Sequence, residues 1–177
     1  MAFAARTIYC VDTSSFLYCQ KSFAERGSRR AFFAPVWALL GQLADEGRLR
    51  APRLVFDEIT MNNDEIGQWA AAHRGVFQPN GEHAALVMDI LKDPGQRLVD
   101  PTGPRGGEEA DPWVIALAEA ISAVAATLWD REIGVVVSEE TKAGGIADIC
   151  GRRMLEHIDL TAMLIREGVS MGGAPVL

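Results

Sequence analysis

The segment of residues 8–15, Ile-Tyr-Cys-Val-Asp-Thr-Ser-Ser, most constrains what this chain can fold into. Its apolar residues predict a short strand that ends at Asp12, and the hydroxyl residues that follow can begin a helix. A second apolar run, Gly-Val-Val-Val at 134–137, ends in the same way at Ser138. Short apolar strands alternating with helices predict a small parallel sheet covered by helices. Ligands bind at the carboxyl ends of such strands, which is where Asp12 is expected.

We therefore predict a three-layer α/β/α fold and a single domain spanning residues 1–177. No apolar run reaches the roughly 18 residues that a membrane helix needs, and residues 1–6 are too short for a signal peptide. The three cysteines, Cys10, Cys19 and Cys150, are odd in number and lack paired metal-ligand spacing. Their pattern predicts reduced thiols and a cytoplasmic protein.

The remaining elements follow from apolar periodicity and from glycine, proline and asparagine breaks. The expected strands cover residues 8–12, 48–52, 98–99 and 134–138. The expected helices cover residues 14–26, 36–43 with Pro35 in the first turn, 55–61, 64–73 with Asn62 or Asn63 as cap, 82–92, 112–128, 146–153 and 160–167. Residues 100–107 have the composition of a loop.

The net charge of −7 argues against a protein that binds nucleic acid through a generally basic surface. It leaves room for a nuclease whose acidic residues are concentrated at one metal site. Basic residues do gather locally, near residues 21–30, 48–53 and 152–153, and a solvated helix or loop face is the simplest explanation of each group.

Four carboxylates have unusual local settings. Asp12 and Glu140 follow apolar strands, Glu58 interrupts an apolar helical start, and Asp111 opens a long apolar helix. If these acids converge they repel one another, unless a divalent cation neutralises them. Mg²⁺ prefers oxygen ligands, and such an ion can polarise a phosphodiester and lower the pKa of a bound water. The hydroxyls next to the strand ends, those of Thr13, Ser14 and Ser138, could orient a ligand or a water.

Asp111 and Asp12 also have simpler explanations. Asp111 precedes Pro112, which makes it a good helix N-cap, and a helix N-terminus itself favours an ionised carboxylate. Asp12 can form a turn with Ser14.

The two glutamate positions have simpler explanations as well. Glu58 can be a solvated helix residue, with its neighbour Asp57 as the alternative inward acid. Glu140 and Glu139 can both be charged loop residues.

The order of four short motifs resembles the PIN-domain superfamily. They are Asp-Thr-Ser-Ser-Phe-Leu from residue 12, Phe-Asp-Glu-Ile from residue 56, Glu-Ala-Asp-Pro-Trp-Val-Ile-Ala from residue 109 and Val-Val-Ser-Glu-Glu from residue 136. The resemblance spans residues 8–165. The chain is most similar to a bacterial subfamily of PIN-like proteins that shares the Asp-Pro-Trp helix start and the segment Ile-Ala-Asp-Ile-Cys at 146–150.

This resemblance implies a Mg²⁺- or Mn²⁺-dependent endoribonuclease, commonly a VapC-like toxin of a type II toxin–antitoxin pair. By position, Asp12, Glu58 and Asp111 match three catalytic, metal-binding acids of the family. Glu140 matches the fourth, where many members carry an Asp, and Glu139 is a possible substitute for it. The resemblance then implies hydrolysis of RNA by a metal-bound water, without a covalent intermediate.

Substrate and partner residues are less specific. Because the overall field is unfavourable to RNA, local cations would hold the phosphates, with Arg29, Arg30 and Arg105 as candidates. The family likeness implies a protein antitoxin that blocks the acidic cleft. The apolar faces of the 36–43 and 112–128 helices could serve a homodimer or that antitoxin, and core packing is the alternative for both.

Other enzyme classes fit less well. A haloacid-dehalogenase-type phosphotransferase needs a second Asp where Ser14 stands, and no phosphate-binding glycine motif follows a strand. Asp148 could be a further acid near the site, or a residue of a helix surface. The competing function is a PIN-like interaction module without catalysis, which metal binding would distinguish from a nuclease.

Overall fold

All strands that the structure describes lie in one parallel sheet. The computed structural model describes residues 5–23, 30–62, 64–100, 102, 109–124 and 131–169, with residues 30–33 described by backbone alone. The strands are β1 (Arg6–Val11), β2 (Leu49–Pro52), β3 (Phe77–Gln78), β4 (Glu132–Val137) and β5 (Glu156–Ile158). Their order in the sheet is β3-β2-β1-β4-β5, and each neighbouring pair is parallel.

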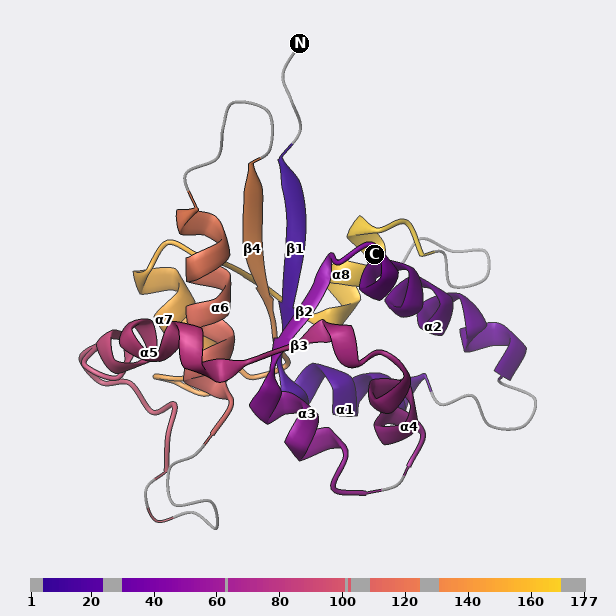
Figure 1. Cartoon of the computed structure of the whole chain (residues 1–177), viewed down its shortest axis with the longest axis horizontal. Coiled ribbons are helices and arrows are strands. Elements are labelled where there is room, and N and C mark those ends of the chain that lie inside the picture. The colour runs from indigo at the N-terminus through magenta and orange to yellow at the C-terminus, as the bar shows by residue number, and fades with distance from the viewer. Residues whose placement is uncertain are drawn as a thin grey trace.

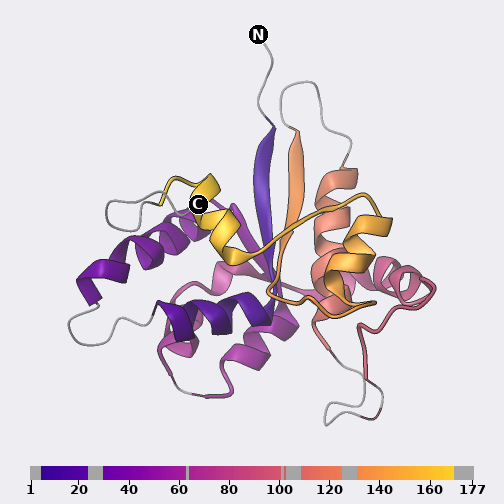
Figure 2. The ribbon, with the colours of Figure 1, turned by 180° about the vertical axis from the view of Figure 1, so that it is seen from behind.

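Helices cover both faces of this sheet, as Figures 1 and 2 show from opposite sides. One face carries α5 (Ala84–Ile90), α6 (Asp111–Ala123) and α7 (Ile146–Arg152). The other face carries α1 (Thr13–Ser22), α2 (Arg30–Asp45) and α8 (Leu160–Arg166), with α3 (Arg53–Ile59) and α4 (Glu65–Ala72) packed next to α1. The predicted three-layer α/β/α fold is therefore confirmed.

The core is densest where α6 packs on the two central strands. Residues 8–11 of β1 and 135–137 of β4 are almost completely buried. Gly134 lets the helix approach this closely, since a Cβ at that position would lie 2.3 Å from the Ala118 carbonyl oxygen. Burial on all sides of a strand explains the continuous apolar runs in the sequence.

Several element predictions were wrong in detail. The α2 helix begins at Arg30, so Pro35 lies inside it and gives up one backbone hydrogen bond, which the buried stripe that follows offsets. Residues 98–99 form no strand, although Leu98 is buried. The strands β3 and β5 were not predicted, because two or three residues show no periodicity. Asp64 caps α4 by accepting from the Gly67 N–H at 3.1 Å.

The strand order creates a switch point between β1 and β4. The chain leaves β1 through α1 and α2 on one face to reach β2, and it enters β4 through α5 and α6 on the other face. The loops at the carboxyl ends of these two strands therefore run toward opposite faces of the sheet, and in open α/β sheets this is the place where ligands bind. None of the helices in the described ranges is both long and apolar enough to cross a membrane.

Candidate functional site

Asp12 lies at the carboxyl end of β1, directly at the switch point. It caps α1, and its Oδ2 accepts from the Ser14 backbone N–H at 3.1 Å and the Ser14 hydroxyl at 2.6 Å. The side chain is buried, and within the described residues its Oδ1 has no hydrogen-bond partner. Burial raises the pKa of Asp12, the bonds from Ser14 oppose this shift, and the nearby Glu140 carboxylate adds to it. The turn with Ser14 therefore exists, and it leaves one carboxylate oxygen available.

Asp111 is the first residue of α6, and the N-cap position belongs to Ala110. The alternative explanation of Asp111 as the helix N-cap is not borne out, because Ala110 occupies that position and Asp111 is already helical. The pKa of Asp111 is raised to about 8, most of all by burial and then by the carboxylates of Asp12, Glu140, Glu109 and Glu58, in that order. The structure thus brings the four predicted acids into one electrostatic neighbourhood.

Glu58 reaches this neighbourhood from α3. Its carboxylate accepts a hydrogen bond from the Thr13 hydroxyl, at the start of α1. Its neighbour Asp57 is exposed instead and pairs with Arg53 at 3.1 Å on the solvent side of the same helix. Between the two acids that the sequence offered here, the structure directs Glu58 toward Asp12 and Asp57 toward water.

Glu140 and Glu139 also separate clearly. Glu139 accepts from the backbone N–H of Leu160 at 2.8 Å, at the start of α8. Glu140 accepts from the Ile146 N–H at 3.0 Å and faces Lys142 at 3.4 Å, while its charge raises the pKa values of the two aspartates. Glu140 is therefore the acid of this pair that belongs with the cluster, and Glu139 holds a helix end.

Hydroxyl groups join the ends of β1 and β4 beneath the acids. The Ser14 hydroxyl accepts from the Glu139 backbone N–H at 3.1 Å and lies 3.4 Å from the Ser138 hydroxyl. Ser138 in turn accepts from the Glu140 N–H at 3.0 Å. These hydroxyls, which the sequence suggested as ligand contacts, are engaged in holding the two strand ends together.

The chemistry of the cluster fits a hard divalent cation. It consists of carboxylate oxygens, the donors that Mg²⁺ prefers, and the unpartnered Oδ1 of Asp12 is a buried polar atom that lacks a counterpart. Burial raises the pKa of Asp111 most, and repulsion from the neighbouring carboxylates adds to it; a nearby cation would oppose both effects. In the described ranges, no three His, Cys, Asp or Glu side chains are already close enough to form a metal-binding group.

Some residues fall outside this group. Asp148, in the first turn of α7, accepts from the N–H of Gly144 in the preceding turn at 2.6 Å. Arg29 and Arg105 lie outside the described residues, and only the backbone of Arg30 is described.

Glu109, which the sequence did not identify as a site residue, also raises the pKa of Asp111. Its position two residues before Asp111 was the only signal in the sequence.

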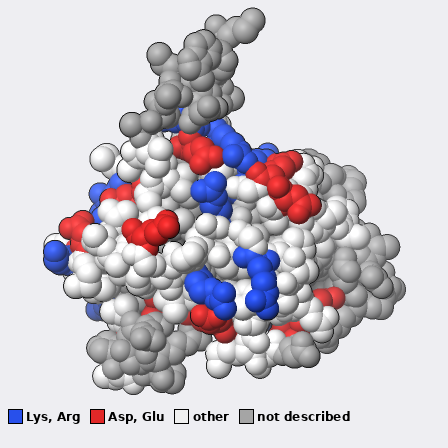
Figure 3. Space-filling model, viewed as in Figure 1, with Lys and Arg blue, Asp and Glu red and all other residues white. Residues whose placement is uncertain are grey.

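Two arginines that were not proposed as substrate contacts lie over one aromatic ring next to the site. The guanidinium of Arg53 lies 4.5 Å from the centre of the Phe56 ring, and that of Arg74 lies 5.4 Å from it. Phe56 and Glu58 belong to the same helix, α3. In Figure 3 two basic patches lie side by side over the region of α3. The spacing of 53 and 74 in the sequence gives no hint of this pairing.

Comparison with known proteins gives a family without an assigned activity. No curated protein and no solved structure matches the chain. Residues 9–171 match the family described as Domain of unknown function (DUF4411), and because this match covers most of the sequence, the chain belongs to that family.

Proposed function

We propose that the protein is a metal-dependent endoribonuclease of the PIN type, which hydrolyses phosphodiester bonds in RNA. The observation that carries the proposal is the buried carboxylate of Asp12 at the switch point, with one oxygen unpartnered and Asp111, Glu58 and Glu140 around it. The order of the motifs in the sequence supports the same function.

The residues would divide the work as follows. Asp12, Asp111, Glu58 and Glu140 would hold one or two Mg²⁺ or Mn²⁺ ions, directly or through water. When bound, such an ion supplies Lewis-acid polarisation of the phosphate and a more acidic water. Ser14 fixes the Asp12 side chain so that Oδ1 stays available, and the Thr13 hydroxyl holds Glu58.

Substrate phosphates would be held by Arg53 and Arg74 on the ring of Phe56. A guanidinium presents a planar fork of donors that suits a phosphate, and stacking on the ring limits how far each side chain can move. Both residues are exposed. On the face shown in Figure 3, basic and acidic side chains form separate small patches, so RNA would be positioned locally and not by one large basic surface.

Substitution of Asp12 and Glu58 tests the proposal directly. We expect Asp12→Asn and Glu58→Gln to lower the rate of RNA cleavage by roughly 100-fold or more and to weaken Mn²⁺ binding measured by calorimetry. Asp45→Asn is the control, because it removes an exposed carboxylate from the last residue of α2, away from the carboxyl ends of the strands. Cleavage at the wild-type rate by Asp12→Asn would overturn the proposal.

The regulatory context is part of the same proposal. A toxin of a type II pair would be held inactive in the cytoplasm by a protein antitoxin, and the free, buried thiols of Cys10, Cys19 and Cys150 are compatible with a reducing compartment. Expression of the lone protein should slow growth, and coexpression with the product of the adjacent gene should restore it. Harmless expression of an active protein would contradict the toxin role.

A non-catalytic interaction module is the second candidate, and the net charge of −7 is the observation in its favour. Such a module would bind neither Mg²⁺ nor Mn²⁺ at the acids. Calorimetric titration of the intact protein with Mn²⁺ distinguishes the two functions before any substrate is known.

A further inference from the structure

A pocket of about 380 Å³ is lined in part by α3 and α6, the helices that carry Glu58 and Asp111, and it is not explained by the proposed chemistry. Its volume falls within the range of about 300–1,000 Å³ that is typical of small-molecule sites. Most of the residues that line it are apolar, namely Leu54, Val87, Leu91, Val99, Pro112 and Trp113. Asn80 supplies an amide to its wall, and Met88 on α5 lines it with a largely exposed side chain.

Three residues that line the pocket are close in the sequence to two of the acids. Pro112 and Trp113 directly follow Asp111 at the start of α6, and Leu54 lies one helical turn before Glu58 on α3. An occupant of this pocket would therefore lie between the two elements that carry Asp111 and Glu58.

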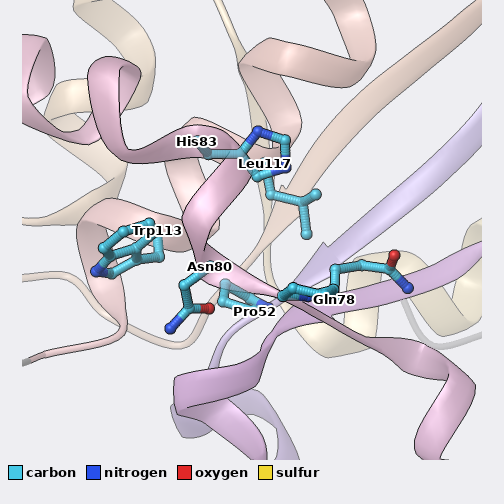
Figure 4. Close-up of a pocket in the computed structure, with 7 residues that line it drawn as sticks. Pro52, Gln78, Asn80, His83, Trp113 and Leu117 are labelled. Carbon is cyan, nitrogen blue, oxygen red and sulfur yellow. The ribbon is translucent and has the colours of Figure 1, made fainter.

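Trp113 and Asn80 also line a second, narrow crevice. Figure 4 shows them there with Pro52, Gln78, His83 and Leu117. This crevice has no room for a water molecule. The Asn80 Oδ1 accepts from the Arg53 backbone N–H at 3.0 Å, so its amide group is held while its NH₂ can still donate. The wall of the pocket thus combines a fixed indole with a fixed amide.

We propose that this pocket binds one nucleobase of the RNA substrate, next to the phosphodiester that is cleaved. The inference rests on the proposed nuclease function and adds to it a subsite for a base. An indole provides a stacking surface for any base, and an amide can donate to a base carbonyl or ring nitrogen. Arg53 lies on α3 next to Leu54, and Arg74 lies in the short 3₁₀ turn that follows α4; both would hold the adjoining phosphates from the ring of Phe56.

The test compares RNA with the same backbone lacking its bases. An Asp12→Asn protein, which should not cleave, is titrated with a labelled RNA octamer of mixed sequence and with an abasic octamer of equal length, and fluorescence polarisation reports both affinities. Stacking of one base on an aromatic side chain contributes roughly 5- to 100-fold in affinity. The octamer with bases should therefore bind at least several-fold more tightly.

Three further substitutions in the Asp12→Asn protein test whether the pocket causes the preference for RNA with bases. Trp113→Leu removes the stacking surface. Met88→Glu places a charge at the mouth of the pocket on an exposed side chain, so folding is not at risk. Ile165→Glu is the matched control, since it makes the same kind of change on an exposed side chain of α8, on the opposite face of the sheet. The first two should abolish the preference for bases and leave the affinity for the abasic octamer unchanged, and the control should keep both.

The outcomes separate the two proposals. If the wild-type protein cleaves RNA but Trp113→Leu and Met88→Glu retain the preference for bases, the base subsite is wrong and the nuclease function stands. Equal losses in Met88→Glu and Ile165→Glu would indicate general repulsion and also overturn the subsite. If RNA is neither bound nor cleaved, both proposals fail.

Discussion

At the scale of single residues, the structure shows that acids adjacent in the sequence have different contacts, which the sequence alone does not reveal. Asp57 and Glu58 are adjacent, as are Glu139 and Glu140, yet in each pair one residue joins the cluster and the other serves a local contact. The sequence predicted that Asp12 ends a strand, because an apolar run stops there. Which of two adjacent glutamates turns inward depends on loop geometry, and no pattern of residue types encodes it.

Asp111 should make the metal-free protein less stable as the pH rises. Its pKa of about 8 in the folded state lies above the value of about 3.9 expected for an unfolded chain. The folded state therefore binds more protons between these values, and the free energy of unfolding falls on going from pH 4 to pH 8. Asp111→Asn should reduce that fall by on the order of a few kcal/mol, as measured by urea unfolding in EDTA.

Addition of Mn²⁺ at pH 8 provides the control. It should restore stability to the wild-type protein and much less to Asp111→Asn. Identical pH profiles for the two proteins in EDTA would show that Asp111 is not repelled by its neighbours.

Substitution of Glu139 should lower stability, whereas substitution of Glu140 should weaken metal binding. Glu139→Ala removes the acceptor of the Leu160 N–H and should cost about 1–3 kcal/mol in the free energy of unfolding, without changing Mn²⁺ affinity. Glu140→Gln should weaken Mn²⁺ binding in calorimetry with a smaller effect on stability. A loss of metal affinity in Glu139→Ala alone would reverse the assignment of the fourth acid.

At the scale of elements, predictability followed length and periodicity. The segments that form β1, β4 and α6 could be predicted from the sequence, because each is buried on nearly all sides and is therefore continuously apolar. The short edge strands β3 and β5 exist because neighbouring strands pair with them, which is tertiary information. The pairing also explains why Phe77–Gln78 forms a strand although the more apolar residues 98–99 do not.

The contact between α6 and β4 makes Gly134 hard to replace. A methyl group there would overlap the Ala118 backbone, so Gly134→Ala should lower the free energy of unfolding by about 1–3 kcal/mol through overpacking. Gly151→Ala is the matched control, because nothing lies within 4 Å of its Cβ position in α7, and it should raise stability by roughly 0.5–1 kcal/mol. Chemical denaturation measures both. Equal stabilisation by the two substitutions would show that the helix can shift freely.

At the scale of the whole molecule, the fold brings together acids that lie far apart in the sequence. Their motif order resembled a known superfamily, which is how the cluster was anticipated. The pocket beside Trp113 was not anticipated, because its walls come from α3, α5, α6 and the loops between them. A cavity is a property of how elements pack, so only the structure could locate it.

Arg153 stabilises the packing of one helical layer over a wide area. Its guanidinium donates to both oxygens of Asp93 at 2.7 and 2.9 Å, to Glu119 at 2.9 Å and to Asp89 at 3.0 Å. Arg153→Met should therefore lower the free energy of unfolding at pH 7 by roughly 1–3 kcal/mol. Urea denaturation of both proteins measures this difference.

The stabilisation from the contact between Arg153 and Asp93 depends on pH. Hydrogen bonds from Arg153 lower the pKa of Asp93 in the folded state, so this stabilisation is present at neutral pH and is lost as the pH falls through that lowered pKa. The difference between wild-type and Arg153→Met should shrink in acid. A difference that is constant down to pH 2 would exclude this origin.

The unpartnered oxygen of Asp12 has a consequence for how long the protein survives. Repulsion among the carboxylates around Asp12 favours local unfolding at this end of the sheet, and proteases cleave locally unfolded states. A divalent ion that binds only the folded form suppresses such opening by mass action. The supply of that ion in the cell would then govern the lifetime of the protein as well as its activity, so a depleted cell would both silence and clear it.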